Sequence, residues 1–314
     1  MDAEHAGVTA PRHGLVHEAA AAMRTLEICL MDGVSPEVAL ARLAVHVDTG
    51  IDAADLADIA LAMRSNDSAE RYWLKSVAAL LLRKLDDFED LRAAAAAVCH
   101  EIGKGEMAAA TVQRLASGFD RAAAISPAAS VQLSSLGDEE ILAATTAEIV
   151  GWLEGHGFIG SGKDILDIGC GIGRFETALH AKVGRLVGID ISSTMLAIAG
   201  RQCASFANVE LRQTSGLDLT DFADKSFDGI LAVDSFPYLV LAGLAERHLS
   251  EMARVLRPGG MAAILNYSYR GAVALDRYDI HRFANESGMR IIVDAEMPFS
   301  RWDGTAFLLR AGGT

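Results

Sequence analysis

The spacing of apolar positions divides this chain into two parts with different periodicities. Between residues 12 and 125, apolar residues recur three and four positions apart, as they do from residue 56 to residue 63, and this spacing predicts helices. Ser35 followed by Pro36 indicates one helix start, because serine caps free N–H groups and proline fits the first turn; Ser68 indicates another. The pattern predicts about five or six helices in an all-helical domain over residues 1–130.

A different pattern follows a segment of small and turn-forming residues at 125–137, which predicts a linker. An amphipathic helix is expected at about 138–154, and short apolar segments follow it. The expected strands are 163–168, 185–190, 208–212, 228–233, 260–267, 289–295 and 305–310. Strands that alternate with helices predict a second domain, residues 131–314, with an α/β, doubly wound, mostly parallel seven-stranded sheet. Too few residues separate the last two strands for a helical crossover, so we expect an antiparallel edge hairpin.

Composition and charge narrow the classes of protein. The 314 residues are 51% apolar, yet no apolar run approaches the roughly 18–20 residues of a membrane span. The segment Met1–Gly7 lacks the basic start and apolar core of a secretion signal, so we expect a cytoplasmic protein without membrane contacts. A formal charge of −14 argues against nucleic acid as a partner. The spacing of the cysteines fits neither a disulfide framework nor a zinc site, which predicts reduced thiols and no metal cofactor; they are Cys29, Cys99, Cys170 and Cys203.

The segment Ile165-Leu-Asp-Ile-Gly-Cys-Gly-Ile-Gly-Arg-Phe175 gives the clearest chemical signal. Three glycines at alternate positions follow the acidic Asp167 at the end of an apolar strand. A dinucleotide fingerprint would need a glycine where Arg174 stands, so that interpretation fails. A glycine turn lets a ligand approach the main chain, and an acidic side chain suits a cationic amine better than a phosphate. The alternative is a glycine-rich turn that binds no ligand.

Further segments follow at regular intervals. Asp190 ends the second strand 23 residues after Asp167, and its two carboxylate oxygens can accept both hydroxyls of a ribose. Ser226-Phe-Asp228 precedes the fourth apolar strand, and residues 234–238 follow that strand. Arg254-Val-Leu-Arg-Pro-Gly-Gly260 reads as the turn before the fifth strand.

Together these segments resemble the class I S-adenosylmethionine-dependent methyltransferases over residues 138–314. The resemblance implies a Rossmann-like fold and S-adenosylmethionine as cosubstrate. It also implies a donor site made of Asp167, Gly169, Cys170, Gly171, Gly173, Asp190, Ile191, Ser215, Gly216, Leu217 and Asp234. Family members commonly carry aspartate where this chain has Ser215. Adenine is therefore expected to contact Ser215, Asp218 or the backbone at Gly216 and Leu217.

The residues beyond the fourth and fifth strands face the expected acceptor. Methyl transfer from a sulfonium depends mainly on alignment, and a base is needed only when the acceptor arrives protonated. We take Asp234, Tyr238 and Tyr267 as the catalytic candidates and Tyr269 as a further one. Asp234 fits a turn equally well, and the tyrosines after the fifth strand fit the packing of a cavity wall.

The leading hypothesis is methylation of a small molecule, such as a secondary metabolite, at oxygen, nitrogen or carbon. The helical domain would cap the acceptor pocket, and it is a candidate surface for a homodimer. Three alternatives stay open: a peptide or protein methyltransferase whose helices bind the substrate chain, a donor-binding regulatory or scaffold protein without catalysis, and aminopropyl transfer. The helices show no fixed-period repeat, so a tetratricopeptide array has little support.

Overall fold

The computed structural model describes residues 13–47, 50–98 and 106–312. Cys99, one of the cysteines expected to be a reduced thiol, lies outside these ranges. So does the segment Met1–Gly7, which was examined for a secretion signal. The chain divides into two compact units, Met1–Arg92 and Ala93–Thr314. Each is described by itself. None of the helices in the described ranges is long and apolar enough to cross a membrane.

The first unit is helical, as expected. Its helices are α1 (His13–Asp32), α2 (Pro36–His46), α3 (Ala53–Ala62), α4 (Ser68–Arg83) and the beginning of α5 (Leu85–Ala97). The predicted start of α2 is confirmed, because the Ser35 hydroxyl accepts the N–H of Val38 and Pro36 is the first helical residue. The start of α4 lies one residue earlier than expected. Asp67 caps this helix by accepting the N–H of Ala69 at 2.6 Å, and Ser68 is already helical.

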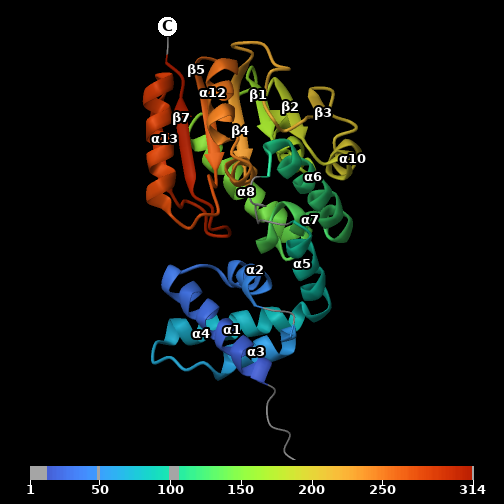
Figure 1. Cartoon of the computed structure of the whole chain (residues 1–314), viewed down its shortest axis with the longest axis vertical. Coiled ribbons are helices and arrows are strands. Elements are labelled where there is room, and N and C mark those ends of the chain that lie inside the picture. Colours follow the sequence, from blue (N-terminus) through green and yellow to red (C-terminus); the bar gives the residue numbers. More distant parts are fainter. Residues whose placement is uncertain (1–12, 48–49, 99–105, 313–314) are drawn as a thin grey trace, which may run out of the picture. The chain divides into compact units, whose positions relative to one another are not determined.

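The boundary between the units differs from the one expected near residue 130. The segment predicted as a linker contains α7 (Pro127–Val131) and the 3₁₀ turn η1 (Leu133–Ser135). Helix α6 (Ala108–Ile125) packs against α7 and against α10 (Ser193–Gln202), which follows the second strand (Figure 1). Long-range packing therefore assigns α6 and α7 to the unit that contains the sheet.

The second unit is built on one seven-stranded sheet, which confirms the predicted α/β class. The strands are β1 (Asp164–Ile168), β2 (Arg185–Asp190), β3 (Val209–Gln213), β4 (Phe227–Val233), β5 (Leu256–Leu265), β6 (Arg290–Glu296) and β7 (Ala306–Arg310). Their order is β3-β2-β1-β4-β5-β7-β6. β1 to β5 are parallel, and β7 pairs antiparallel with both β5 and β6. The expected edge hairpin is present, with β7 as its inner strand.

Helices cover both faces of this sheet (Figure 1). On one face, α8 (Glu139–Gly155) and α9 (Arg174–Leu179) bury apolar side chains against the strands. On the other face, α12 (Ala245–Val255) and α13 (Val273–Ser287) do the same. The remaining elements are η2 (His180–Lys182) and α11 (Phe236–Leu241).

Strand order reverses at β1, which pairs with β2 on one side and with β4 on the other. In open parallel sheets, ligands bind beyond the carboxyl ends of the strands at such a switch point. A ligand site is therefore expected at the turns that follow β1, β2, β3 and β4.

Candidate functional site

The turn after β1 requires glycine at all three predicted positions. Gly169, Gly171 and Gly173 have φ angles of +78°, +55° and +82°, in the left-handed region that residues with a Cβ rarely adopt. Space is also limited. A Cβ on Gly171 would lie 2.7 Å from Cγ1 of Val131, and one on Gly173 would lie 2.9 Å from Cβ of Ala199.

Asp167 lies beneath this turn with 1% of its surface exposed. Its Oδ2 atom is buried and has no hydrogen-bond partner among the described residues. Burial raises the pKa of this carboxyl, whereas the positive charge of Arg174 lowers it. A buried acid with an unsatisfied oxygen is costly unless a partner is supplied, and it fits the cationic amine that the resemblance implies.

Asp190 joins the ends of β1 and β2. Its Oδ2 accepts the N–H of Gly171 at 2.9 Å, and its Oδ1 accepts the N–H of Ser192 at 2.8 Å. Burial raises the pKa of this carboxyl, and the backbone donors oppose that shift. Each carboxylate oxygen can accept a second hydrogen bond, so Asp190 keeps the capacity to bind two hydroxyls.

The turn after β3 presents backbone rather than acidic side chains. Ser215 is exposed, and its hydroxyl accepts the N–H of Leu217 at 3.3 Å. A Cβ on Gly216 would lie 2.6 Å from Cγ2 of Ile191, so this turn lies close to the residue after Asp190. Asp218 is already engaged by Thr220 and by Arg247, the latter at 2.5 Å. Of the expected adenine contacts, the exposed Ser215 remains, whereas the N–H groups of Gly216 and Leu217 already donate to the hydroxyls of Thr214 and Ser215.

The ends of β4 and β5 bring a carboxylate and two tyrosines together. Asp234 has a φ angle of +55°, and its Oδ1 accepts hydrogen bonds from Asn266 Nδ2 at 2.7 Å and from the Tyr269 hydroxyl at 2.9 Å. The hydroxyls of Tyr269 and Tyr238 lie 3.4 Å apart, and the ring of Phe119 lies 4.9 Å from that of Tyr238. Burial raises the pKa of Asp234, and its two donors oppose that shift. The sequence did not indicate Asn266 or Phe119.

Tyr267 is not part of this cluster. Only 2% of its surface is exposed, its ring stacks on Phe236 at 5.2 Å, and its hydroxyl lies 3.4 Å from Asp279. β5 ends at Leu265 and Asn266 has a φ angle of +68°, so the alternation of a strand does not continue here. These contacts favour the packing alternative for Tyr267 over the expected catalytic role.

Arg174 is a further residue that sequence reasoning did not assign to the site. Its Nη1 donates to Oε1 of Gln132 at 2.8 Å, and its guanidinium lies 4.6 Å from the centre of the Phe175 ring. Burial lowers the pKa of Arg174 to about 10, and the charges of Asp234 and Asp167 oppose that shift. The guanidinium is thus within electrostatic reach of acids from both β1 and β4. The only sequence signal was its place directly after the third glycine.

Helices α6 and α7, called here the covering segment (residues 108–131), lie against two of these turns. Val131 contacts the turn after β1 at Gly171, and Cγ1 of Val112 would lie 3.0 Å from a Cβ on Gly216 in the turn after β3. Asp120 fixes the segment to the start of α10, where its Oδ1 accepts the Ser192 hydroxyl at 2.6 Å and the Thr194 N–H at 2.9 Å.

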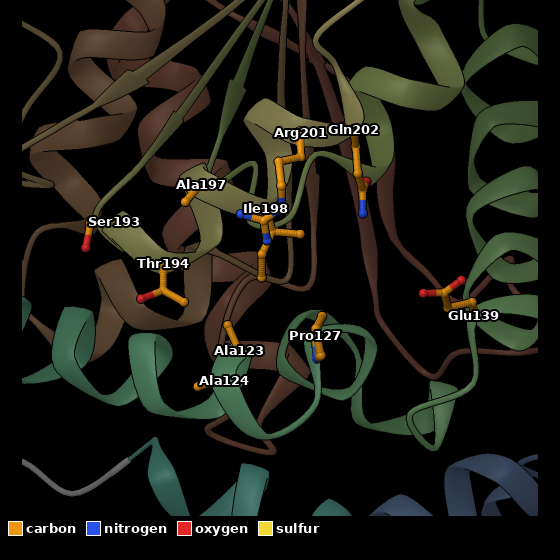
Figure 2. Close-up of a pocket in the computed structure, with 10 residues that line it drawn as sticks. All are labelled: Ala123, Ala124, Pro127, Glu139, Ser193, Thr194, Ala197, Ile198, Arg201 and Gln202. Atoms are coloured by element: carbon orange, nitrogen blue, oxygen red, sulfur yellow. The ribbon is translucent and has the colours of Figure 1, made fainter.

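A groove of about 580 Å³ runs between the covering segment and α10 (Figure 2). Ala123, Pro127 and Ile198 supply apolar walls, and Arg201 and Glu139 supply charges. The lining of this groove does not include Asp167, Asp190 or Asp234. No group of three or more His, Cys, Asp or Glu side chains with the arrangement of a metal site occurs in the part of the chain that the structure describes.

Comparison with known proteins agrees with this geometry. Residues 165–260 match the protein family described as a methyltransferase domain. A demethylmenaquinone methyltransferase from Tropheryma whipplei is 42% identical over 110 residues, which are 35% of this chain and 44% of the relative. A 2-phytyl-1,4-naphtoquinone methyltransferase from Thermosynechococcus vestitus is 35% identical over 132 residues, 41% of this chain and 55% of the relative. The chain thus spans about half the length of these curated relatives.

A solved structure shows the same fold. Phosphoethanolamine N-methyltransferase 1 from Haemonchus contortus, in complex with phosphoethanolamine and S-adenosylhomocysteine, has a TM-score of 0.50 and 15% identity, covering 68% of this chain and 52% of the other. The matched family residues include the β1 turn and Asp190, and they end where β5 begins its pairing with β7. Residues 165–260 of this chain thus match a methyltransferase domain, and the unit that contains them has the Rossmann-like fold of that solved structure.

Proposed function

We propose that this protein transfers the methyl group of S-adenosylmethionine to a small-molecule acceptor. The observation that carries the proposal is the buried Oδ2 of Asp167, which has no partner among the described residues and lies beneath a glycine turn. In this assignment Asp167 receives the ammonium group of the donor and Asp190 receives its ribose hydroxyls. Ser215 receives its adenine.

The charges of the site support a cationic donor. Asp167, Asp190 and Asp234 lie at the ends of neighbouring strands, and burial raises the pKa of each. A sulfonium and an ammonium bring two positive charges, which stabilise these carboxylates in their ionised form. Arg174, whose positive charge interacts with those of Asp167 and Asp234, is the residue we assign to the carboxylate of the donor.

For the acceptor, we propose a flat, hydroxylated aromatic ring of the kind found in secondary metabolites. The rings of Phe119, Tyr238 and Tyr269 meet edge to face beside Asp234. Aromatic side chains in such contacts favour planar ligands. The two relatives described above are named for quinones, demethylmenaquinone and 2-phytyl-1,4-naphtoquinone, which supports a ring-shaped acceptor.

Asp234 is the proposed general base. It would take the proton of a ring hydroxyl as the carbon–sulfur bond of the donor breaks and a bond from the methyl carbon to the acceptor forms. Deprotonation activates the ring oxygen and the ring carbons next to it, so it serves methylation at either atom. Asn266 and Tyr269 hold the carboxylate in place through Oδ1.

We also propose that the helical unit, Met1–Arg92, forms a homodimer. Met31 and Tyr72 expose 82% and 75% of their surfaces in this unit. Met31→Glu combined with Tyr72→Glu should convert a dimer into a monomer in light scattering. A monomeric wild type, or a dimer that survives both substitutions, would reject this part of the proposal.

Calorimetric titration with S-adenosylhomocysteine tests the donor site, and Asp167→Asn should weaken binding. Release of S-adenosylhomocysteine during incubation with hydroxylated naphthalenes, peptides or a decarboxylated donor plus a polyamine then separates the alternatives. Turnover with the aromatic panel is the expected result. Turnover with peptides alone would favour the protein methyltransferase. Donor binding without turnover would favour the silent regulator, and a wild type that does not bind S-adenosylhomocysteine would refute the proposal.

A further inference from the structure

Glu176 is a fully buried acid that the donor site described above does not use. It lies on α9, a helix whose Phe175 and Leu179 are also buried, and 0% of its surface is exposed. Neither of its carboxylate oxygens has a hydrogen-bond partner among the described residues. A charged carboxylate in such surroundings is strongly unfavourable, so a physical reason for its presence is required.

The register of the sheet places this carboxyl beside Asp167. β1 and β2 pair so that Asp167 lies opposite Gly188, and paired positions of parallel strands direct their side chains to the same face. A Cβ on Gly188 would lie 2.5 Å from Oε1 of Glu176. The Glu176 carboxyl therefore occupies the space that a side chain at position 188 would fill, next to the side chain of Asp167. Gly188 has to be a glycine for this arrangement to exist.

Two ionised carboxylates offer only acceptors to each other, whereas one proton between them converts one group into a donor. Such a proton satisfies an oxygen on each side chain and removes one buried charge. The balance of forces places this proton on Glu176. Burial, followed by the charge of Asp167, raises the pKa of Glu176 well above its usual range. Burial also raises the pKa of Asp167, but only to about 7, because the charge of Arg174 opposes that shift.

The other groups that face the pair favour the same distribution. Asp190 on β2 raises the pKa of both carboxyls, whereas the positive charge of Arg174 acts to lower that of Asp167. The thiols of Cys170 and Cys203 also face Glu176, and burial raises the pKa of each, so both stay neutral near pH 7.

We propose that Glu176 is a positioning residue: a neutral carboxylic acid whose O–H donates to Asp167 and keeps Asp167 as the anion that receives the donor's ammonium group. This inference rests on the proposed function, since it needs Asp167 in contact with the donor. It adds a second carboxyl, placed by Gly188, that sets the charge state of the first.

The test compares two substitutions and two ligands. Glu176→Gln keeps an N–H that can donate to Asp167, whereas Glu176→Leu fills the apolar site without a donor. S-adenosylhomocysteine carries the ammonium group, and 5′-methylthioadenosine keeps the adenosine and the sulfur but lacks the amino-acid part. Calorimetry at several pH values measures both ligands, and thermal melts show that each variant is folded.

We expect Glu176→Gln to bind S-adenosylhomocysteine within about threefold of the wild type and Glu176→Leu to lose about tenfold or more. Both variants should bind 5′-methylthioadenosine as the wild type does. In Glu176→Leu, the pH at which S-adenosylhomocysteine affinity reaches half its maximum should move upward, because Asp167 has lost its donor. Infrared spectra of the wild type should show the carbonyl stretch of a buried carboxylic acid, absent from Glu176→Gln.

Three results would overturn the inference while leaving the proposed function in place. These are unchanged S-adenosylhomocysteine affinity in Glu176→Leu, equal weakening of both ligands, and a wild-type infrared spectrum without a protonated acid. If Glu176→Leu does not fold, the infrared comparison of the wild type with Glu176→Gln decides. A wild type that binds neither ligand removes the donor site itself, and this inference with it.

Discussion

Replacing Asp190 with alanine should weaken donor binding and loosen the glycine turn, because the same carboxylate serves both. Two of its acceptor positions hold the N–H groups of Gly171 and Ser192. The other two are assigned to the ribose hydroxyls. Hydrogen bonds to a charged group contribute about 1.5–3 kcal/mol each, so the loss of two weakens binding by about 3–6 kcal/mol. This corresponds to about 10²- to 10⁴-fold in the dissociation constant.

The structural part of the effect can be measured separately. Each backbone N–H left buried without an acceptor costs about 1–3 kcal/mol, so Asp190→Ala should lower the free energy of unfolding by about 2–6 kcal/mol without ligand. Asp190→Asn is the matched control, because it keeps one acceptor oxygen. It should fall between the wild type and alanine in calorimetry with S-adenosylhomocysteine and in denaturant titration. Donor affinity in Asp190→Ala within about threefold of the wild type would refute the assignment of Asp190 to the ribose.

Three further predictions concern other residues of the same unit. Asp234→Asn should lower kcat by about 10²- to 10⁴-fold, with a much smaller loss of donor affinity in calorimetry from its missing charge; equal kcat would remove its role as base. Tyr269→Phe should lower kcat and Tyr267→Phe should not, and the reverse order would contradict the cluster. Asp120→Asn should lower the free energy of unfolding by about 1–2 kcal/mol near pH 7. Burial acts to raise the pKa of Asp120, but its hydrogen bonds outweigh burial and lower it. In denaturant titrations, the stability difference between the wild type and Asp120→Asn should therefore be complete above the ordinary carboxyl pKa. It should vanish as the pH falls through the lowered pKa of Asp120.

The parts of the fold that local sequence controls were predicted well. Each strand carries its own apolar run, and the glycines after β1 all have positive φ angles, so the β1–α9 motif was readable from one segment. Helix starts were readable to within one residue, since Asp67 and Ser68 are both good caps and only the geometry decides between them. Asp167 and Asp190 lie within the last two residues of β1 and β2, and Asp234 follows β4 directly, which places all three at the switch point once the strands are known.

The parts of the site that depend on distant contacts could not be predicted. Asp120 meets Ser192 across 72 positions in the chain, and the small residues that follow α6 read as a linker. Glu176 reads as an ordinary polar position in the first turn of a helix. Its burial follows from the pairing of Asp167 with Gly188, which the sequence alone does not specify. Tyr267 and Tyr269 read as equivalent residues of one strand, because the sequence does not show that the left-handed Asn266 ends the strand before both of them.

The covering segment has a practical consequence for the construction of chimeras. A sequence-based design that joined the N-terminal helices of one enzyme to the catalytic half of another would place the junction near residue 130. That cut would exchange Val112 and Asp120 together with the helices, and with them the contacts to Gly216 and Ser192, and it would part Val131 from the rest of the covering segment. A junction placed before Ala108 transfers the catalytic half with its own α6 and α7, so grafts designed in this way should retain donor affinity.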